Sequence, residues 1–278
     1  MMELLLALLF EAIRAEPPEK IHPSVLFGKL MEKLYSLFPK TKVFGLISLS
    51  IVVIFAYILS LTPNLFPTPL KEVFASYLLY SSISIRSMIE HAKNCLKNGE
   101  ILREEVAKIV SRDVSQLDRS KLSSAVIESV AENFVDGVLA PLLYYSVFGV
   151  SGALIYRAVN VCDAMVGYKD EKFRDFGFFS AKLDDALNFL PARISPFLYS
   201  PKVVFCAFSK NPKFNGHSIS AMACLLKLKL TKPGSYEINS GKDPEVEDVL
   251  RSLKVFTRLS AEAVLLSAAL RLASTYTF

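Results

Sequence analysis

The stretch VFGLISLSIVVIFAYILSLT, residues 43–62, decides the fold class. It carries no charge over its 20 residues, which matches the roughly 20 residues that a helix needs to cross the hydrocarbon core of a bilayer. A buried helix of a soluble core is the alternative, but such helices rarely stay uncharged for that length. Residues 43–62 therefore predict a transmembrane helix in an integral membrane protein.

The composition supports this class. Of the 278 residues, 52% are hydrophobic and 21% are charged, whereas an average soluble domain is about 45–50% apolar and about 25% charged. Disorder is excluded, because the burial of so many apolar side chains offsets the loss of chain entropy. The four cysteines form no CxxC pair, and the three histidines complete no zinc-binding pattern with them, although His91 stands four residues before Cys95. Neither a zinc site nor a disulfide scaffold is expected.

The net charge of +5 comes from lysines and arginines spread over loops that flank apolar segments. The sequence has no GxxxxGK[ST] loop, dinucleotide fingerprint, GxSxG or HExxH, and no nucleic-acid-binding motif, so no nucleic acid partner is expected. Basic residues gather in residues 14–42 and 86–121, whereas residues 63–72 hold only Lys71. This bias predicts that the loops at residues 14–42 and 86–121 are cytoplasmic.

Other apolar segments are shorter or interrupted. The N-terminal MMELLLALLF lacks the basic region and cleavage site of a signal peptide, so it predicts a retained interfacial or membrane helix. Residues 73–85 are short and serine-rich, and would cross a bilayer only with help from neighbours. Residues 255–278 are broken by charges and predict a tilted or bundle-facing helix.

Residues 138–156, VLAPLLYYSVFGVSGALIY, would count as one span by hydropathy, but Gly149, Ser151 and Gly152 stand in the middle. We predict a helical hairpin that rises to Phe148 and descends from Gly152 to about residue 165. Such a hairpin keeps the polar segments on either side of it on one face of the membrane.

The segments together predict an all-α protein, a polytopic membrane bundle with broken or re-entrant helices and polar loops. Residues 186–208 contain three prolines and predict a broken or interfacial segment. Residues 209–254 are polar and predict an extramembrane loop or small subdomain. We expect one membrane domain over residues 1–278, with its functional motifs in residues 110–196, and a multi-pass protein of the cell membrane.

Ionisable side chains in residues 110–196 are interleaved with apolar ones. Glu128, Glu132 and Asp136 fall on one helix face within roughly 80° of each other. The three carboxylates repel one another, which lowers the stability of the fold unless a cation or a basic partner lies between them. Carboxylates near bilayer depth usually mark a functional site. A solvated helix face is the alternative. Gly137 and Pro141 indicate that this helix is locally loosened.

Three further groups have a functional and an ordinary interpretation. Asn160 and Asp163 can hold a metal ion or a hydroxyl group, while Arg157 and Lys169 hold phosphate. The alternative is an ordinary helix with a salt-bridged end. Adjacent aspartates at 184 and 185 suit Mg²⁺, or complement a helix start. Residues 112 and 113, Arg-Asp, form a phosphate clamp or a local ion pair.

Four motifs follow in order: SRDVSQLD (111–118), VIESVAENFVDGVLAPLLYY (126–145), YRAVNVCDAMVGYKDEKFRDFG (156–177) and SAKLDDALNFLPARI (180–194). This succession resembles the CbiB/CobD family of cobalamin biosynthesis, the adenosylcobinamide-phosphate synthases. Weaker likeness extends to His22, Pro23 and Gly28 and to GHSISAMACLLKLKL (216–230). The family's VGRDT reads VSRDV here, and its LGGP is eroded around residues 230–234, while the charged residues of the central motifs are all present.

The resemblance implies a membrane enzyme that joins a carboxylate of adenosylcobyric acid to aminopropanol or its O-phosphate, with ATP and Mg²⁺. The resemblance does not assign roles to individual residues; the candidate catalytic residues are Glu128, Glu132, Asn133, Asp136, Asn160 and Asp163. The residues expected to bind ATP or substrate are Arg112, Asp113, Arg157, Tyr168, Lys169 and Arg193. The expected metal ligands are Glu128, Glu132, Asp136, Asp184 and Asp185.

Two other functions are compatible with these features. The AmpE-like branch of the superfamily is a non-catalytic signalling or regulatory alternative, which the intact acidic motifs argue against. A transporter component is the second alternative, suggested by broken helices around Pro191 and Pro196. No inverted repeat in the sequence supports it.

Overall fold

A computed structural model describes residues 1–168 and 170–276, the last three as helical backbone only. It is 73% helical, and its strands in the described residues form two antiparallel two-stranded sheets. The prediction of an all-α protein is therefore confirmed. The chain forms two compact units, each assembled from separate segments. This division does not test the expected single membrane domain over residues 1–278, which stays a prediction.

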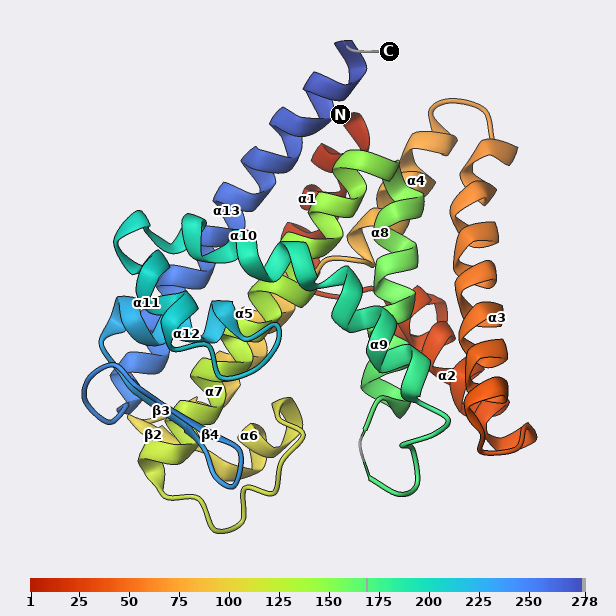
Figure 1. The fold of residues 1–278 in the computed structure, drawn as a ribbon. Helices are drawn as coiled ribbons and strands as arrows, with labels where there is room; N and C mark the ends of the chain where they lie inside the picture. The colour runs from red at the N-terminus through yellow and green to blue at the C-terminus, as the bar shows by residue number, and fades with distance from the viewer. Residues whose placement is uncertain (169, 277–278) are drawn as a thin grey trace. The chain divides into compact units, whose positions relative to one another are not determined.

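Unit 1 comprises Met1–Ser84, Ala140–Asn188 and Leu265–Phe278. Its elements are α1 (Met2–Ile13), η1 (Glu19–Ile21), α2 (Pro23–Leu37), α3 (Lys42–Leu61), η2 (Thr62–Leu65), α4 (Leu70–Tyr80), α8 (Ala140–Val166), α9 (Phe178–Leu187) and the end of α13 (Val246–Tyr276). Helix α1 packs on α4, and Figure 1 shows α3 running alongside an arm of α8, with which it is in contact.

Helix α3 confirms the helix predicted from residues 43–62. Its hydroxyl N-cap is Thr41, whose side chain accepts from the Phe44 N–H at 3.5 Å. Small residues line its packed face, and at Gly45 an added Cβ would lie 1.9 Å from the carbonyl oxygen of Phe176. The opposite face exposes large apolar side chains to the surroundings: Val43, Leu46, Ile47, Ile54 and Ile58.

Two helical stretches in the described part of the chain are long and apolar enough to cross a membrane, residues 42–65 and 119–166. The first has a mean hydropathy of 2.5 and the second of 1.8. Helices α1 and α4 have 12 and 11 residues, so each is shorter than the roughly 20 residues of a span. A polytopic bundle with further spans stays a prediction.

Helix α8 is broken at Gly149, as the hairpin prediction required. This glycine has φ 66° and ψ −157°, a conformation that glycine adopts at little cost. Figure 1 shows the two arms of α8 meeting at a turn. The end of α13 packs on the first arm, where the Ser146 and Ser267 hydroxyls lie 2.8 Å apart. This fits the bundle-facing helix expected for residues 255–278.

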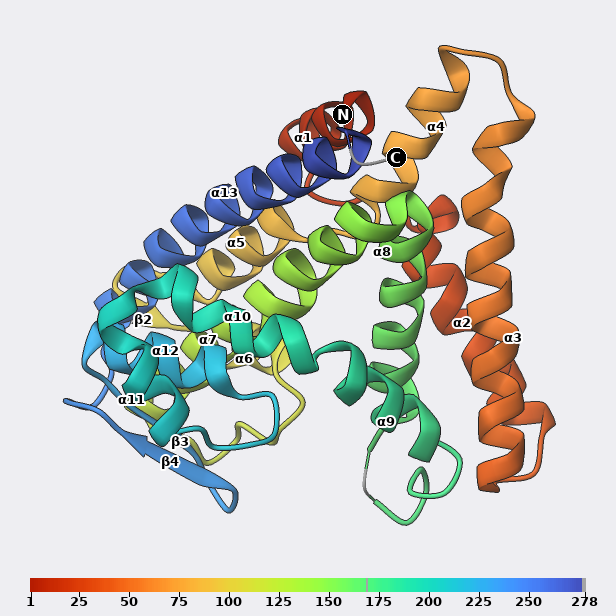
Figure 2. The same ribbon diagram turned by 45° about the horizontal axis from the view of Figure 1, so that its top comes forward.

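Unit 2 comprises Ile85–Leu139 and Phe189–Val264. Its elements are α5 (Ile85–Asn94), β1 (Leu96–Lys97), β2 (Glu100–Ile101), α6 (Arg103–Ile109), α7 (Arg119–Phe134), the π-helix η3 (Val135–Leu139), α10 (Phe189–Tyr199), η4 (Pro201–Val203), α11 (Val204–Ser209), α12 (His217–Leu226), β3 (Lys229–Lys232), β4 (Tyr236–Asn239) and the start of α13. Helix α7 is its core, buried on every side over residues 122–131. Strand β3 packs against α7 (Figure 2).

Two local features of unit 2 bear on the sequence predictions. The π-helix η3 confirms the loosening predicted from Gly137 and Pro141, because a proline has no N–H for the carbonyl four residues earlier. A disulfide joins Cys206 of α11 to Cys224 of α12. The sequence predicted no disulfide scaffold and did not indicate this one pair, which the fold brings together across a separation of 18 residues.

Candidate functional site

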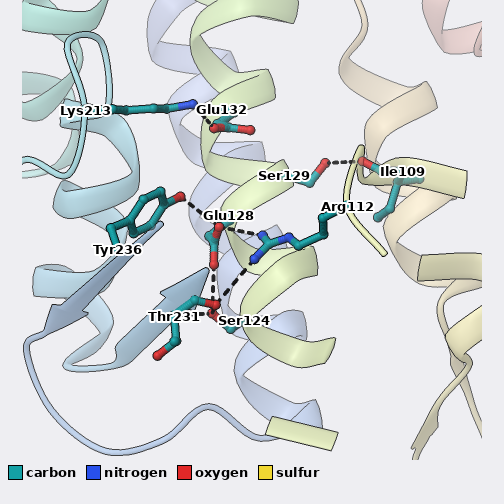
Figure 3. Close-up of polar contacts among 9 residues, drawn as sticks. All are labelled: Ile109, Arg112, Ser124, Glu128, Ser129, Glu132, Lys213, Thr231 and Tyr236. Atoms are coloured by element: carbon teal, nitrogen blue, oxygen red, sulfur yellow. Dashed lines mark hydrogen bonds and ion pairs between the residues drawn. The ribbon is translucent and has the colours of Figure 1, made fainter. Parts of the chain in front are cut away.

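Glu128 of α7 is the centre of a buried polar cluster in unit 2 (Figure 3). Its side chain is 3% exposed, and its Oε2 lies 2.6 Å from Arg112 Nη2. The hydroxyl of Tyr236 donates to the same oxygen at 2.8 Å, and that of Ser124 donates to Oε1 at 2.9 Å. Both carboxylate oxygens are therefore already bound by the protein.

The same cluster fixes the β3–β4 hairpin to α7. The Thr231 N–H donates to Ser124 Oγ at 2.8 Å, and the Thr231 carbonyl accepts from Arg112 Nη1 at 3.4 Å. Burial, followed by the charge of Glu128, raises the pKa of Tyr236 well above its ordinary value. Tyr236 thus remains a hydrogen-bond donor at any physiological pH. We call Arg112, Ser124, Glu128, Thr231 and Tyr236 the Glu128 cluster.

One turn further along α7, Glu132 forms an ion pair with Lys213 from the loop before α12 (Figure 3). Burial alone would lower the pKa of Lys213, but the charges of Glu132, Asp136 and Glu128 raise it above the ordinary lysine value. The carboxylate stripe predicted from the sequence thus has basic partners, Arg112 and Lys213. The sequence indicates Arg112 as a functional candidate, but it does not indicate Lys213 and Tyr236, which have no local pattern linking them to α7.

The other candidates in unit 2 have separate contacts. Asn133 donates from its side-chain amide to the Ser129 carbonyl at 3.0 Å. Asp113 accepts from the N–H and hydroxyl of Ser115, which lower its pKa; Arg112 pairs with Glu128 rather than with Asp113. Arg193 lies 3.6 Å from the Phe189 ring centroid.

Asp184 of α9 is the centre of a second polar network, in unit 1. The amide nitrogen of Asn160 donates to its Oδ1 at 3.2 Å, and that of Asn188 donates to its Oδ2 at 3.0 Å. Tyr156 donates to Asn188 Oδ1 at 2.8 Å, and Arg157 donates to Asn160 Oδ1 at 3.3 Å. We call these five residues the Asp184 network. Three predicted residues, Arg157, Asn160 and Asp184, are therefore linked.

Arg157 extends this network to the Ser84 hydroxyl, to which it donates. It also lies near His22, whose pKa is lowered by burial and then by the Arg157 charge. His22 is the N-cap of α2, where its Nδ1 accepts from the Ser24 N–H at 3.2 Å. A lowered pKa keeps this imidazole neutral and able to accept at neutral pH. Asn188, the C-cap of α9, is not among the predicted residues, although its position four residues after Asp184 could have indicated it.

A cavity of about 510 Å³ in unit 1 opens beside this network. Tyr156 belongs to both, and it stacks on Tyr144 with ring centroids 5.4 Å apart. The Tyr144 hydroxyl donates to the Leu187 carbonyl at 2.9 Å. The cavity is lined mainly by apolar and aromatic side chains, including Tyr57, Leu61, Phe148 and Ile155. Such a site suits a ligand with a large apolar surface and few polar groups.

The remaining candidates of unit 1 lie around the end of α8 and the start of α9. Asp163 is half-buried, and its carbonyl accepts from the Gly167 N–H at 2.7 Å. Tyr168 is exposed, with its ring 6.0 Å from that of Phe173. Asp185 is half-buried beside Asp184. The prediction for Lys169 lies outside the described residues.

The five predicted metal ligands are divided between the two units. Glu128, Glu132 and Asp136 belong to unit 2, and Asp184 and Asp185 to unit 1. Over residues 1–168 and 170–276, no group of three or more His, Cys, Asp or Glu side chains is placed to hold a metal ion. Mg²⁺ bound with a nucleotide needs only one or two carboxylates beside the phosphates. Adjacent aspartates such as Asp184 and Asp185 fit that requirement.

Comparison with known proteins gives a consistent result. The family described as CobD/Cbib protein matches residues 4–264. A probable cobalamin biosynthesis protein CobD of Archaeoglobus fulgidus is 48% identical over 270 residues, covering 94% of this chain and 91% of the relative. One of Pyrococcus furiosus is 42% identical over 278 residues, covering 96% and 97%. No solved structure matches the chain.

Proposed function

Because the chain belongs to the CobD/Cbib protein family and so has a role in cobalamin biosynthesis, we propose that it is an adenosylcobinamide-phosphate synthase. The proposed reaction joins a side-chain carboxylate of adenosylcobyric acid to aminopropanol or aminopropanol O-phosphate through an amide bond. ATP supplies the energy. The relatives' names support the pathway, and the motifs of residues 111–194 support this step.

The chemistry sets what the site must do. A carboxylate is a poor electrophile, so we propose that ATP first transfers its γ-phosphoryl group to it, which gives an acyl phosphate and ADP. The amine, after loss of its ammonium proton, attacks the acyl carbon; the C–N bond forms and inorganic phosphate leaves. The site must therefore place two anionic substrates together, bind an ammonium group and accept a proton.

The Asp184 network is the observation that carries this proposal. Amide donors on both sides hold the Asp184 carboxylate in one position, next to a cavity with aromatic walls. In this arrangement Asp184 and Asp185 would hold Mg²⁺, which neutralises phosphate charge when bound. Arg157 would bind a phosphate or a corrin carboxylate. We assign proton acceptance to Asp163, three residues after Asn160 on the same helix.

The Glu128 cluster has a different place in the proposal. Its charge is already neutralised by the buried ion pair with Arg112, so we propose that Glu128 orders the β3–β4 hairpin instead of binding metal. Glu132 and Asp136, beside the half-exposed Lys213, stay candidates for contacts with ATP. Arg193 is a candidate for the same role.

We further propose that the protein is a multi-pass protein of the cell membrane. The exposed apolar face of α3 and the hairpin of α8 support this location, because apolar side chains that face lipid cost nothing there. The bilayer would then border unit 1 along α3.

A reconstitution assay tests the proposal. The full chain in proteoliposomes is given adenosylcobyric acid, ATP and Mg²⁺ with either aminopropanol or its O-phosphate, and product mass is measured. The proposal is supported if the product has the mass of adenosylcobyric acid plus that of the amine, less one water, and if one ADP is released for each amide bond formed. Binding of the corrinoid without product or ADP would instead indicate a non-catalytic protein.

A further inference from the structure

Unit 2 carries an exposed aromatic surface that the proposed reaction does not use. Phe205 on α11 is 85% exposed, and Leu190 and Phe197 on α10 are 61% and 59% exposed. Phe189 and Phe208 add to it at 46% and 43%. We call these five residues the α10–α11 surface. Single exposed apolar residues are ordinary, but large ones gathered on consecutive short elements mark an interaction surface.

The helices that carry this surface are too short to cross a bilayer. Helix α10 has 11 residues and α11 has six, or about 17 Å and about 9 Å at 1.5 Å per residue, against a hydrocarbon core of about 30 Å. Pro196 lies inside α10 and Pro201 begins η4. Elements of this kind can lie on a membrane surface but cannot span it.

The chain interval that carries the surface has charges of one sign, although Lys213 and Lys229 within it pair with Glu132 and Glu237. No Asp or Glu occurs between Asp185 and Glu237. The basic residues of this interval are Arg193, Lys202, Lys210, Lys213, Lys227, Lys229 and Lys232. Lys202 is exposed three residues before Phe205. Aromatic side chains interleaved with cations, without carboxylates, complement an anionic lipid surface.

The surface is also held rigidly. A helix of six residues has little stability of its own, but the Cys206–Cys224 disulfide joins α11 to the buried helix α12. Phe208 packs on the His217 ring with centroids 4.7 Å apart. Phe205 therefore projects from a helix that is already held in place. Its insertion into a lipid layer costs little conformational entropy, because the helix does not have to become ordered on binding.

We propose that the α10–α11 surface is a membrane-docking surface of unit 2, which lies in the headgroup layer of an anionic bilayer. Phe197 and Phe205 insert among the acyl chains, and Lys202 pairs with lipid phosphates. This contact is additional to any transmembrane segment and does not depend on the amide-forming activity. The proposed occupant of the surface is lipid. If a protein partner or a second copy of this chain covers the surface instead, the test below gives a different result.

The sequence contains no tryptophan, so one substitution introduces a unique fluorescent reporter. The full-length variant Phe205→Trp is reconstituted in vesicles of phosphatidylglycerol or of phosphatidylcholine. Each set carries a brominated or nitroxide quencher at a shallow or a deep position of the lipid chain. The control is Leu250→Trp, an exposed position of unit 2 on α13 next to the carboxylates of Glu247 and Asp248.

In phosphatidylglycerol, we expect shallow lipid quenching of Phe205→Trp to be at least about twofold stronger than that of Leu250→Trp, as for a side chain inserted among the acyl chains just below the headgroups. Adding Lys202→Gln to Phe205→Trp should reduce this quenching, and phosphatidylcholine should reduce it as well. Equal lipid quenching at the two positions would overturn the proposal. A blue-shifted emission at 205 without lipid quenching would also overturn it, because it would show a protein contact. Amide formation, measured in the same vesicles, reports separately on the proposed function.

Discussion

Arg112 and Glu128, 16 residues apart in the chain, form an ion pair of 2.6 Å in which the carboxylate side chain is 3% exposed and the guanidinium side chain 14% exposed. The pair joins the loop before α7 to the middle of that helix, and Tyr236 joins the β3–β4 hairpin to it. Three segments of unit 2 therefore depend on one carboxylate.

Arg112→Met is predicted to destabilise the protein by about 3–5 kcal/mol, because it leaves the Glu128 charge buried without its partner. Tyr236→Phe, which removes one hydrogen bond to the charge, should cost less, about 1.5–3 kcal/mol. Thermal unfolding in detergent measures both. The exposed pair of Arg86 and Glu90 is the control, since Glu90→Gln should cost less than about 0.5 kcal/mol. Equal effects of the Arg112 and Glu90 variants would contradict the assignment.

The ion pair of Lys213 with Glu132 should be insensitive to pH near neutrality. The pKa of Lys213 is raised from 10.5, so the contribution of the pair to stability is fully present below pH 10.5 and is lost as the pH rises through the folded-state pKa. The difference in stability between wild type and Lys213→Met should therefore be constant from pH 7 to 9. It should shrink above about pH 10.5. A difference that already falls between pH 7 and 9 would show that another group titrates with the pair.

Asp184→Asn is predicted to lower the rate of amide formation by about 10²–10³-fold, the range found when one group is removed from a site that stabilises developing charge. Tyr156→Phe, which releases Asn188, should lower it by roughly tenfold through loss of a positioning bond. Product formation in proteoliposomes is the measurement. Asp170 is exposed and caps a turn at the Phe173 N–H, and Asp170→Asn should retain activity. A fully active Asp184→Asn variant would remove Asp184 from the site.

Gly45→Ala should disturb the packing of α3, because the new Cβ would lie 1.9 Å from the Phe176 carbonyl oxygen. Overpacking of this kind costs about 1–3 kcal/mol. Gly28→Ala is the matched control: it is also a helical glycine, and its added Cβ would meet only side-chain atoms at 3.8 Å. It should be neutral or stabilising by up to about 1 kcal/mol, as expected from helix propensity. Comparison of the two melting temperatures gives the result.

Local sequence patterns predicted the local features of this protein. The uncharged stretch at residues 43–62 predicted α3, and Gly149 and Pro141 predicted the break and the loosened turn that the structure has. Each of these features is determined by the residues of a single segment, without contacts from elsewhere in the chain, so the local sequence is enough to predict it.

Features that depend on tertiary contacts were not predictable in this way. The carboxylates at 128 and 132 indicated that basic partners were needed, but only the fold shows that they are Arg112 and Lys213. Cys206 and Cys224 have no motif spacing, so their pairing becomes visible only when α11 and α12 pack together. Asn188 is the intermediate case, since its spacing from Asp184 is local and would have revealed it.

The segment order of the two units has a consequence for how the protein is made. The chain passes between the units four times, at residues 84, 139, 188 and 264. Unit 1 includes the end of α13 from residue 265 onward, so a ribosome must have synthesised both segments of unit 2 before unit 1 can close. No single cut yields an intact half, and a fragment from either end would leave unit 1 without part of its core. Expression trials with truncated chains should therefore give products that proteases degrade, while the full-length chain accumulates.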